Sequence, residues 1–483
     1  MLAKYLISTV LLTLSTSATS TVAVTKAAAA DQIDALPNAP PLPSNHYSGY
    51  LSASSTKNIH YYLAESENDP ANDPLLIWMN GGPGCSSLDG FLYEHGPYRV
   101  KTRSVVDSNG DSTEEAYLEY FEQSWSKLAN TLYIEAPVGV GFSYSTAGAT
   151  DYNCTDDSTA DDNLAALHSF YEKFPQFVKN DLFITGESYA GVYVPTLAEN
   201  VLLDETFPAK LKGIAVGNGC SGTEVGICSW GDQGSALSAQ FLTSSGFLPQ
   251  TLKNNINDNC DYDSWFSGDG VSDACAKNIE NLNEFTKDLD TYCVYCDCPA
   301  SNTAHSKIHG ANHLLKKKME AQGLKRAPDV STNACINTYE ASLYLNRPDV
   351  QEALGVAAAD VSDWEVCHTA DGWDYTSTRP NLPRDTYPLL TSKINVLIYN
   401  GDWDACVPYT DGESWTSGMG FDAVDAWHTW RIESGDVGGY ATKYDVDGKF
   451  QFVTVKGGRH EVPETEPVRA YEMLEKFLAG EDF

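Results

Sequence analysis

Residues 181–191 read Asp-Leu-Phe-Ile-Thr-Gly-Glu-Ser-Tyr-Ala-Gly, a short apolar run that leads into a tight turn and then into a helical pattern. Gly186 and Ala190 flank Ser188 in the form Gly-x-Ser-x-Ala, and Gly191 follows. A sharp strand-to-helix turn needs small residues, because larger side chains would collide with the neighbouring strand and helix. Such a turn holds the serine hydroxyl above the sheet edge, next to a helix N-terminus. The pattern predicts a nucleophile elbow at Ser188, with an ordinary strand-to-helix turn as the alternative.

Similar apolar runs recur along the chain, and most of them are closed by a turn-forming residue. They cover residues 75–79, 131–135, 181–185, 211–216, 394–399 and 450–455. Such runs are typical of strands buried on both faces of a largely parallel sheet. Helical patterns occupy residues 161–174, 189–203 and 466–478. This alternation predicts an α/β fold, with a central, mostly parallel sheet flanked by helices.

The stretch from about Cys220 to Cys335 departs from this alternation. It carries eight of the twelve cysteines and has no clear buried-strand run. We interpret residues 220–335 as a disulfide-rich insertion that forms a cap over the site. The core then consists of two parts, residues 31–219 and residues 336–483.

The N-terminal thirty residues read as a signal peptide or short pro-region. Lys4 supplies the positive start, residues 5–14 the apolar segment, and residues 15–30 a tract of small side chains. A membrane-anchoring or buried N-terminal helix is the alternative. We exclude residues 1–30 from the predicted fold.

The composition is consistent with a globular protein of the secretory route. Twelve cysteines favour an oxidising compartment, and Asn153 begins a glycosylation sequon, Asn-Cys-Thr. The net charge of −35 argues against nucleic acid as a partner, because phosphate binding needs Lys and Arg. An acidic compartment would neutralise part of this charge. Outside the N-terminus, no apolar stretch is long enough to span a membrane.

A serine hydroxyl is a weak nucleophile until a base takes its proton, so an acid and a histidine should follow the serine along the chain. The apolar run 394–399 leads into Asp402 and Asp404. The run 450–455 leads into a glycine-rich loop with His460, and none of the other nine histidines has that setting. We predict His460 as the base. The residues alone leave Asp402 and Asp404 nearly tied as the acid.

Four segments in this order resemble the signature segments of the serine carboxypeptidases. They are residues 78–87 (WMNGGPGCSS), 187–191 (ESYAG), 401–404 (GDWD) and 460–463 (HEVP). The resemblance extends from about Tyr47 to Leu478, with family-like stretches at residues 137–145 and 344–350. It implies the α/β-hydrolase fold and a location in a vacuole or lysosome or outside the cell. It also implies Asp404 as the acid of a Ser188, His460 and Asp404 triad, with Asp402 shaping the loop.

The resemblance further implies groups that bind the reaction's charges. The backbone amides of Gly82 and Tyr189 would form the oxyanion hole. The residues implied for the substrate carboxylate are Trp78, Asn80, Gly81, Glu94 and Glu187, and Glu461 could join them as in some relatives.

The two glutamates at this site need a physical explanation, because ionised carboxylates would repel the substrate carboxylate. Repulsion and burial raise at least one pKa in such a pair, and a protonated Glu can donate to the substrate carboxylate. We expect acid to favour that state and the proton to be lost toward neutral pH. Glu94 and Glu187 as ordinary surface acids are the alternative. Arg459 departs from the small residue usual before the histidine, and its charge could pair with Glu461 or act on His460.

By resemblance, Cys85 should pair with Cys367 and Cys260 with Cys275. Cys335 is expected to pair with Cys298 or Cys296. Spacing leaves open the partners of Cys154, Cys220, Cys228 and Cys293. Cys406 could be a free thiol that lines the site or a packing residue.

These features together predict a serine-type carboxypeptidase that releases residues from peptide and protein C-termini through an acyl-enzyme, with no metal and no cofactor. An acyltransferase of the same family is one alternative, and a binding or protective protein on the same scaffold is another. The sequence leaves the oligomeric state open, a homodimer included. Basic residues at 316–318 and 325–326 also suggest proteolytic processing between Lys316 and Ala327, against a solvated helix over residues 311–322.

Overall fold

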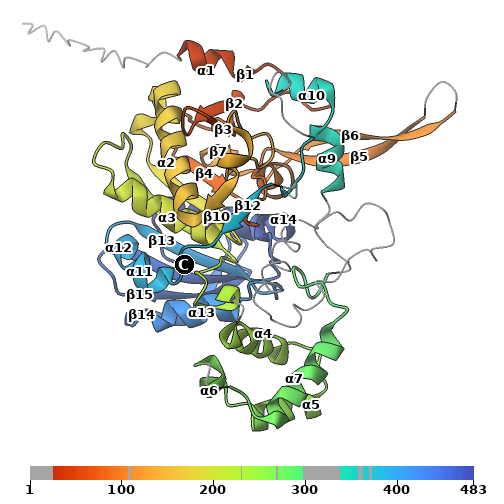
Figure 1. Cartoon of the computed structure of the whole chain (residues 1–483), viewed down its shortest axis with the longest axis vertical. Coiled ribbons are helices and arrows are strands. Elements are labelled where there is room, and N and C mark those ends of the chain that lie inside the picture. Colours follow the sequence, from red (N-terminus) through yellow and green to blue (C-terminus); the bar gives the residue numbers. More distant parts are fainter. Residues whose placement is uncertain are drawn as a thin grey trace, which may run out of the picture.

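The computed structural model describes residues 25–106, 110–229, 231–267, 270–296, 338–356, 363–368 and 372–483. Within them a 12-stranded sheet crosses the molecule (Figure 1). Its strand order is β1 (Gln32–Ile33), β2 (His46–Ser52), β3 (Lys57–Ala64), β7 (Asn130–Ile134), β4 (Leu75–Met79), β10 (Leu182–Glu187), β11 (Leu211–Gly217), β13 (Asn395–Gly401), β16 (Lys449–Val455), β15 (Val437–Tyr444) and β14 (Ala423–Arg431), with β8 (Tyr144–Ser145) beside β3.

The middle of the sheet is parallel, and both of its ends are antiparallel. Strands β7, β4, β10, β11, β13 and β16 pair in parallel. Antiparallel pairs close the sheet on the β1–β3 side and on the β14–β15 side. The six strand-like runs of the sequence are these six parallel strands, so the α/β prediction is confirmed.

Alternate side chains of the parallel strands enter two different cores, because successive residues of a strand point to opposite faces. Leu75, Ile77 and Met79 of β4 lie in one core, and Leu76 and Trp78 lie in the other. Helices cover both faces, which is why these strands are buried along nearly their whole length. The first face carries α2 (Asp156–Lys173), α3 (Ala190–Leu203), α12 (Tyr387–Thr391) and α13 (Tyr409–Gly418). The second carries the π-helical turn η1 (Gly90–Glu94), α9 (Tyr339–Leu345), α10 (Pro348–Ala353) and α15 (Pro467–Ala479).

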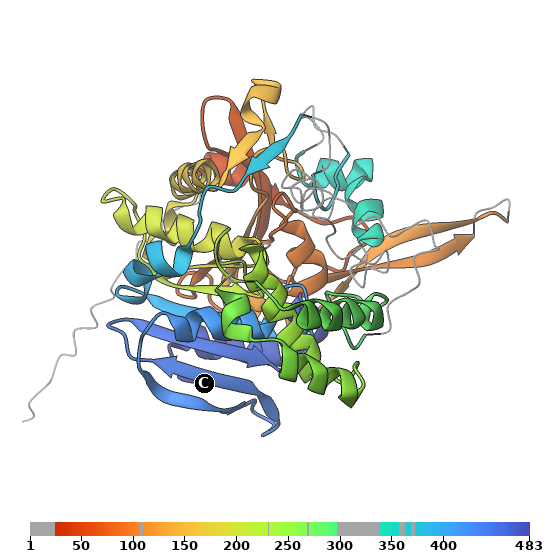
Figure 2. The same cartoon turned by 60° about the horizontal axis from the view of Figure 1, so that its bottom comes forward.

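The described part of the proposed cap is helical and has a small core of its own. It contains α4 (Asp232–Ser244), α5 (Gln250–Asn259), α6 (Tyr262–Phe266) and α7 (Asp273–Thr286), which lie below the sheet in Figure 1 and come forward in Figure 2. The segment after α7 returns to the core. There the Ala405 N–H donates to the Thr291 carbonyl and the Val294 N–H to the Trp403 carbonyl. The insertion therefore contacts the loop that carries the predicted acid.

Smaller elements complete the described chain. They are α1 (Lys26–Ala30), β9 (Asn153–Thr155), β12 (Asp374–Thr376), α11 (Leu382–Asp385), α14 (Val462–Thr465), four 3₁₀ turns (Trp125–Lys127, Gly148–Asp151, Pro175–Lys179 and Ile227–Ser229), and β5 (Tyr98–Val106) paired with β6 (Ser112–Tyr120). The β5–β6 ribbon projects from the body of the molecule in Figure 1. In the described part of the chain, no helix has the length and apolar character needed to cross a membrane.

Helix α1 falls within the residues that we assigned to the targeting segment. The Thr25 hydroxyl donates to the Lys173 carbonyl at 2.6 Å, and Ala28 is fully buried in the first core. The end of the tract of small residues thus packs against α2. Residues 1–24, which hold the rest of the predicted signal peptide, lie outside the described residues.

Four disulfides join described cysteines: Cys85–Cys367, Cys220–Cys228, Cys260–Cys275 and Cys293–Cys296. Pairing of Cys335 with Cys296, one of our two alternatives, is wrong for this structure, because Cys293 lies three residues away and takes Cys296. Cys298, Cys335 and the predicted processing segment lie outside the described residues, so a Cys298–Cys335 bond stays a prediction. Among the described cysteines, Cys154 and Cys406 form no disulfide.

Candidate active site

Ser188 lies in the turn between β10 and α3, with a backbone φ of +60°. That conformation is strained for a residue with a side chain and is held by its neighbours. The Ser188 N–H donates to the Gly217 carbonyl and its carbonyl accepts from the Cys220 N–H, both at 3.0 Å. A Cβ at Gly186 would lie 2.4 Å from the Met79 carbonyl oxygen, so only glycine fits there. The elbow therefore has the crowding that its small residues predict, and Ser188 is partly exposed between buried neighbours.

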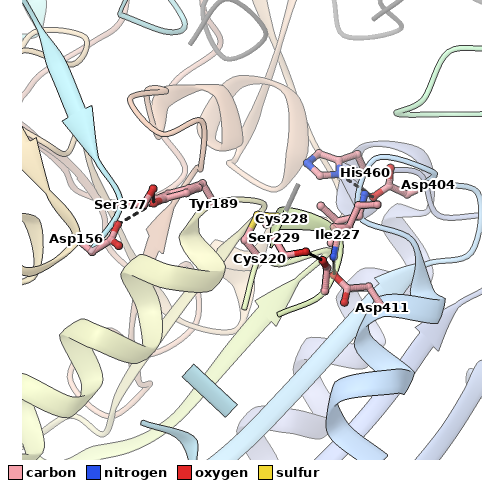
Figure 3. Close-up of a disulfide and its surroundings, with 12 residues drawn as sticks. Asp156, Tyr189, Cys220, Ile227, Cys228, Ser229, Ser377, Asp404, Asp411 and His460 are labelled. Carbon is pink, nitrogen blue, oxygen red and sulfur yellow. Dashed lines mark hydrogen bonds and ion pairs between the residues drawn. A yellow bond between two sulfur atoms is a disulfide. The ribbon is translucent and has the colours of Figure 1, made fainter. Parts of the chain in front are cut away.

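His460 and Asp404 lie together at the same edge of the sheet. They occupy the loops after β16 and β13, and these parallel neighbours end at the same edge. His460 Nδ1 is 2.7 Å from Asp404 Oδ2, and both side chains are buried (Figure 3). Since Nδ1 donates to the carboxylate, Nε2 is the nitrogen left to accept a proton.

Asp404 is held by donors on every side. Its carboxylate accepts from the Asn218 side-chain amide at 2.8 Å, and from the backbone N–H groups of Cys406 at 2.8 Å and Val407 at 3.1 Å. Asp402 points elsewhere and accepts from the Gly457 N–H at 2.7 Å, which ties the two loops together. Of the two aspartates that the residues alone left tied, Asp404 contacts the histidine.

The ring of His460 is oriented by a residue of the insertion. Tyr292 packs edge-on against the ring, with ring centroids 4.7 Å apart. The backbone N–H of His460 also donates to the Tyr292 carbonyl at 3.0 Å. His460 Nε2 is buried and has no hydrogen-bond partner among the described residues. In the described structure, no hydrogen bond joins His460 Nε2 to Ser188. This nitrogen is available to a reacting group.

The loop with Gly81 and Gly82 packs directly against the elbow. A Cβ at Gly81 would lie 2.3 Å from the Tyr189 backbone nitrogen and 2.8 Å from Ser188 Cβ. Tyr189 precedes the first turn of α3, where backbone N–H groups lack helical acceptors. Gly82 has a φ of +114°. The two amides implied for the oxyanion hole thus belong to segments in contact beside Ser188.

Asn80 joins the residues implied for the substrate carboxylate. Its side-chain amide donates to Glu94 Oε1 at 3.1 Å and to Glu187 Oε1 at 3.0 Å. Its oxygen accepts from the Trp78 indole at 2.7 Å and from the Gly90 N–H at 3.1 Å. Trp78 is fully buried and orients Asn80, which in turn brings the two glutamates together.

Burial and mutual repulsion keep protons on these acids. Desolvation, and then repulsion from Glu461, raises the pKa of Glu94 to about 8. Desolvation and repulsion from Glu94 and Glu461 raise the pKa of Glu187 well above its usual range. Asp89 behaves likewise, because burial and the charges of Glu461 and Glu94 raise its pKa. At neutral pH the cluster therefore holds carboxylic acids that can donate hydrogen bonds.

Glu461 differs from these acids because a cation lies beside it. Arg459 is buried and forms ion pairs with Glu461, at 2.5 Å, and with Glu464. The first of the two roles considered for Arg459, the pair with Glu461, is thus present in this structure. The arginine compensates the charge of Glu461 next to the protonated acids.

Several residues of the site were not identified from the sequence. Asn218 links Asp404 to the Gly401 N–H, and Asp89 belongs to the carboxyl cluster. Asn218 lies between two glycines after a strand, a turn signal that we did not use.

Cys406 is free, and burial raises the pKa of its thiol. Asn153 is exposed, while the sequon remains a prediction.

The described residues contain no group of His, Cys, Asp and Glu side chains arranged to hold a metal ion.

Comparison with known proteins agrees with this geometry. The model of the serine carboxypeptidase family matches residues 37–480. Serine carboxypeptidase-like 20 of Arabidopsis thaliana is 33% identical over 91% of this chain and 90% of its own length. The lysosomal protective protein of Mus musculus is 32% identical over 94% of each chain. The fold resembles that of a prohormone-processing carboxypeptidase from Saccharomyces cerevisiae, at a TM-score of 0.66 and 20% identity over 94% of this chain and 96% of that one. Because the family model covers most of the chain and both relatives are more than 30% identical to it, the chain belongs to the serine carboxypeptidase family.

Proposed function

We propose that this hydrolase removes single residues from the C-termini of peptides and proteins, with Ser188, His460 and Asp404 as its triad. Ser188 Oγ attacks the last peptide carbonyl while His460 Nε2 takes its proton. Asp404 stabilises the imidazolium, and the amides of Gly82 and Tyr189 stabilise the oxyanion. His460 then protonates the leaving amine, and a water molecule hydrolyses the acyl-enzyme by the same route.

The observation that carries this proposal is the cluster of Asn80, Glu94 and Glu187 beside the nucleophile. An esterase that acts on neutral chain ends has no use for several buried acids in contact with one amide. Buried acids that retain their protons can donate to a free C-terminal carboxylate, which is ionised at any physiological pH. Exopeptidase specificity follows, because only a terminal residue carries that group next to the scissile bond.

The predicted locations of the protein are a vacuole, a lysosome or the extracellular space, and they fit this chemistry. The relatives include a lysosomal protein, and an acidic lumen keeps the carboxyl cluster protonated.

The pH dependence of KM tests the carboxylate site. A carboxyl with a raised pKa is protonated below that pKa, so the donor is lost as pH rises through it. Glu94, with a pKa of about 8, places this loss at higher pH than the acid-to-neutral range expected from the sequence. We expect KM for a blocked dipeptide with a free carboxylate to be flat in acid and to rise near pH 8. KM for the same dipeptide as its amide should not rise.

Glu94→Gln puts a permanent donor in place of the acid that sets that rise, and should flatten it. Glu172→Gln, on the exposed face of α2, is the control for the loss of one carboxyl. An identical pH profile in Glu94→Gln and the unmodified enzyme would contradict the proposed binding mode. Failure of the dipeptide to be cleaved at all would contradict the proposed activity.

A further inference from the structure

A second buried aspartate lies near the elbow, and the proposed reaction does not use it. Asp156 is the first residue of α2 and is fully buried. Its Oδ1 accepts from the phenols of Tyr189 at 2.8 Å and Tyr375 at 2.7 Å. Its Oδ2 accepts from the backbone N–H groups of Thr378 at 2.6 Å and Arg379 at 2.8 Å. No ion pair reaches it within the described residues, so these four donors and the helix N-terminus stabilise its charge.

Of these four partners, only Tyr189 is adjacent to the nucleophile. Its side chain is fixed at the far end, where the phenol also meets the Ser377 hydroxyl at 2.6 Å. Figure 3 shows Tyr189 extending from the elbow toward Asp156 and Ser377, on the opposite side of the Cys220–Cys228 disulfide from His460. Burial and the Asp156 charge raise the pKa of the phenol well above its usual range, so it remains a donor.

Tyr189 donates hydrogen bonds through its phenol but, among the described residues, none through its backbone N–H. As the residue before α3, it gains no helical hydrogen bond for its N–H, and its neighbour Ser188 is in a strained conformation. The Gly81 loop lies close to the Tyr189 backbone nitrogen, since a Cβ at Gly81 would come within 2.3 Å of it. The Tyr189 ring thus connects this backbone amide to Asp156, which binds the phenol at the other end of the side chain.

We propose that Asp156 is a positioning residue for the oxyanion hole: through the Tyr189 phenol it fixes the direction of the Tyr189 backbone N–H. This inference rests on the proposed catalytic role of that amide. The contact spans from the start of α2 to the start of α3, so it joins two helices that pack on each other at the nucleophile. A fixed donor matters because a misplacement of about 1 Å in an active site can reduce the rate by about 100-fold.

Tyr189→Phe is the decisive variant, because it removes one hydroxyl and keeps the backbone and the ring. We expect kcat for the dipeptide to fall by about 10-fold or more, with KM changed by less than about twofold, since an interaction made in the transition state is lost. Binding of a peptide aldehyde, which forms a tetrahedral adduct with Ser188, should weaken by a similar factor. Binding of the product peptide should not change.

Tyr375→Phe is the matched control, since it removes a similar hydrogen bond to the same oxygen of Asp156. The Tyr375 ring also packs against Tyr189, but its backbone belongs to β12 and not to the elbow. This variant should lower the melting temperature to a similar extent but retain kcat and aldehyde affinity. Equal losses of kcat in the two variants, or an unchanged kcat in Tyr189→Phe, would overturn the proposal. The rate of Ser188 labelling by a fluorophosphonate gives the same comparison even if the dipeptide is not a substrate, so failure of the proposed function remains distinguishable.

Discussion

Ser188→Ala is expected to lose about 10⁶-fold in kcat, since removal of the nucleophile of a triad abolishes nearly all of its covalent catalysis. The fold should survive, because the three hydrogen bonds that hold this residue use its backbone N–H and carbonyl and not its hydroxyl. Labelling by a fluorophosphonate should vanish with the activity. Measurement of both, together with the melting temperature, separates a chemical role from a structural one.

Ser229→Ala is a suitable control for the serine variant. This hydroxyl lies in the same view of the site but donates to the Gly226 carbonyl at 2.8 Å, within its own turn. Full labelling should persist in this variant. Residual labelling of Ser188→Ala would mean that another serine is the nucleophile, and an unfolded Ser188→Ala would mean that we had mistaken a structural role for a catalytic one.

Asp404→Asn is expected to lower kcat by about 10⁴-fold, the effect of an amide in place of a triad aspartate. An asparagine amide can donate to His460 Nδ1 and thereby favour the wrong tautomer of the imidazole. Asp402→Asn is the matched control two residues away. It keeps an oxygen to accept from the Gly457 N–H, so kcat should change little. A large loss in Asp402→Asn combined with a mild one in Asp404→Asn would reverse the assignment of the acid.

The central half of the fold was predictable because its strands are buried on both faces and are therefore largely apolar. β4 covers the residues predicted for it, and β10 begins one residue later and extends to Glu187. The antiparallel strands at the two ends of the sheet were not predicted, for a physical reason. β2 buries polar residues that satisfy one another, such as His46 with the Tyr62 hydroxyl and Ser48 with His60, so the strand lacks an apolar signature.

The same limit applies to the site. Ser188 and His460 stand in local patterns that a single pass along the chain can find. Asn218 and Asp156 act on partners 186 and 33 residues away, so no local pattern shows which groups they hold. Asp89 lies beside the Asn80 loop, but its membership of the carboxyl cluster depends on Glu461, from the other end of the chain. Only the folded chain brings these charges together.

The carboxyl cluster also gives the protein a thermodynamic dependence on pH. An acid whose pKa is higher in the folded than in the unfolded chain takes up a proton on folding, so its contribution to stability is complete below its unfolded pKa, about 4.3 for Glu. For Glu94 that contribution decreases as pH rises and is lost through a pKa of about 8. Asp89 and Glu187 add to it with the same sign. The protons that recognise a peptide's end are therefore also protons that stabilise the folded chain, and alkalinity weakens recognition and folding together.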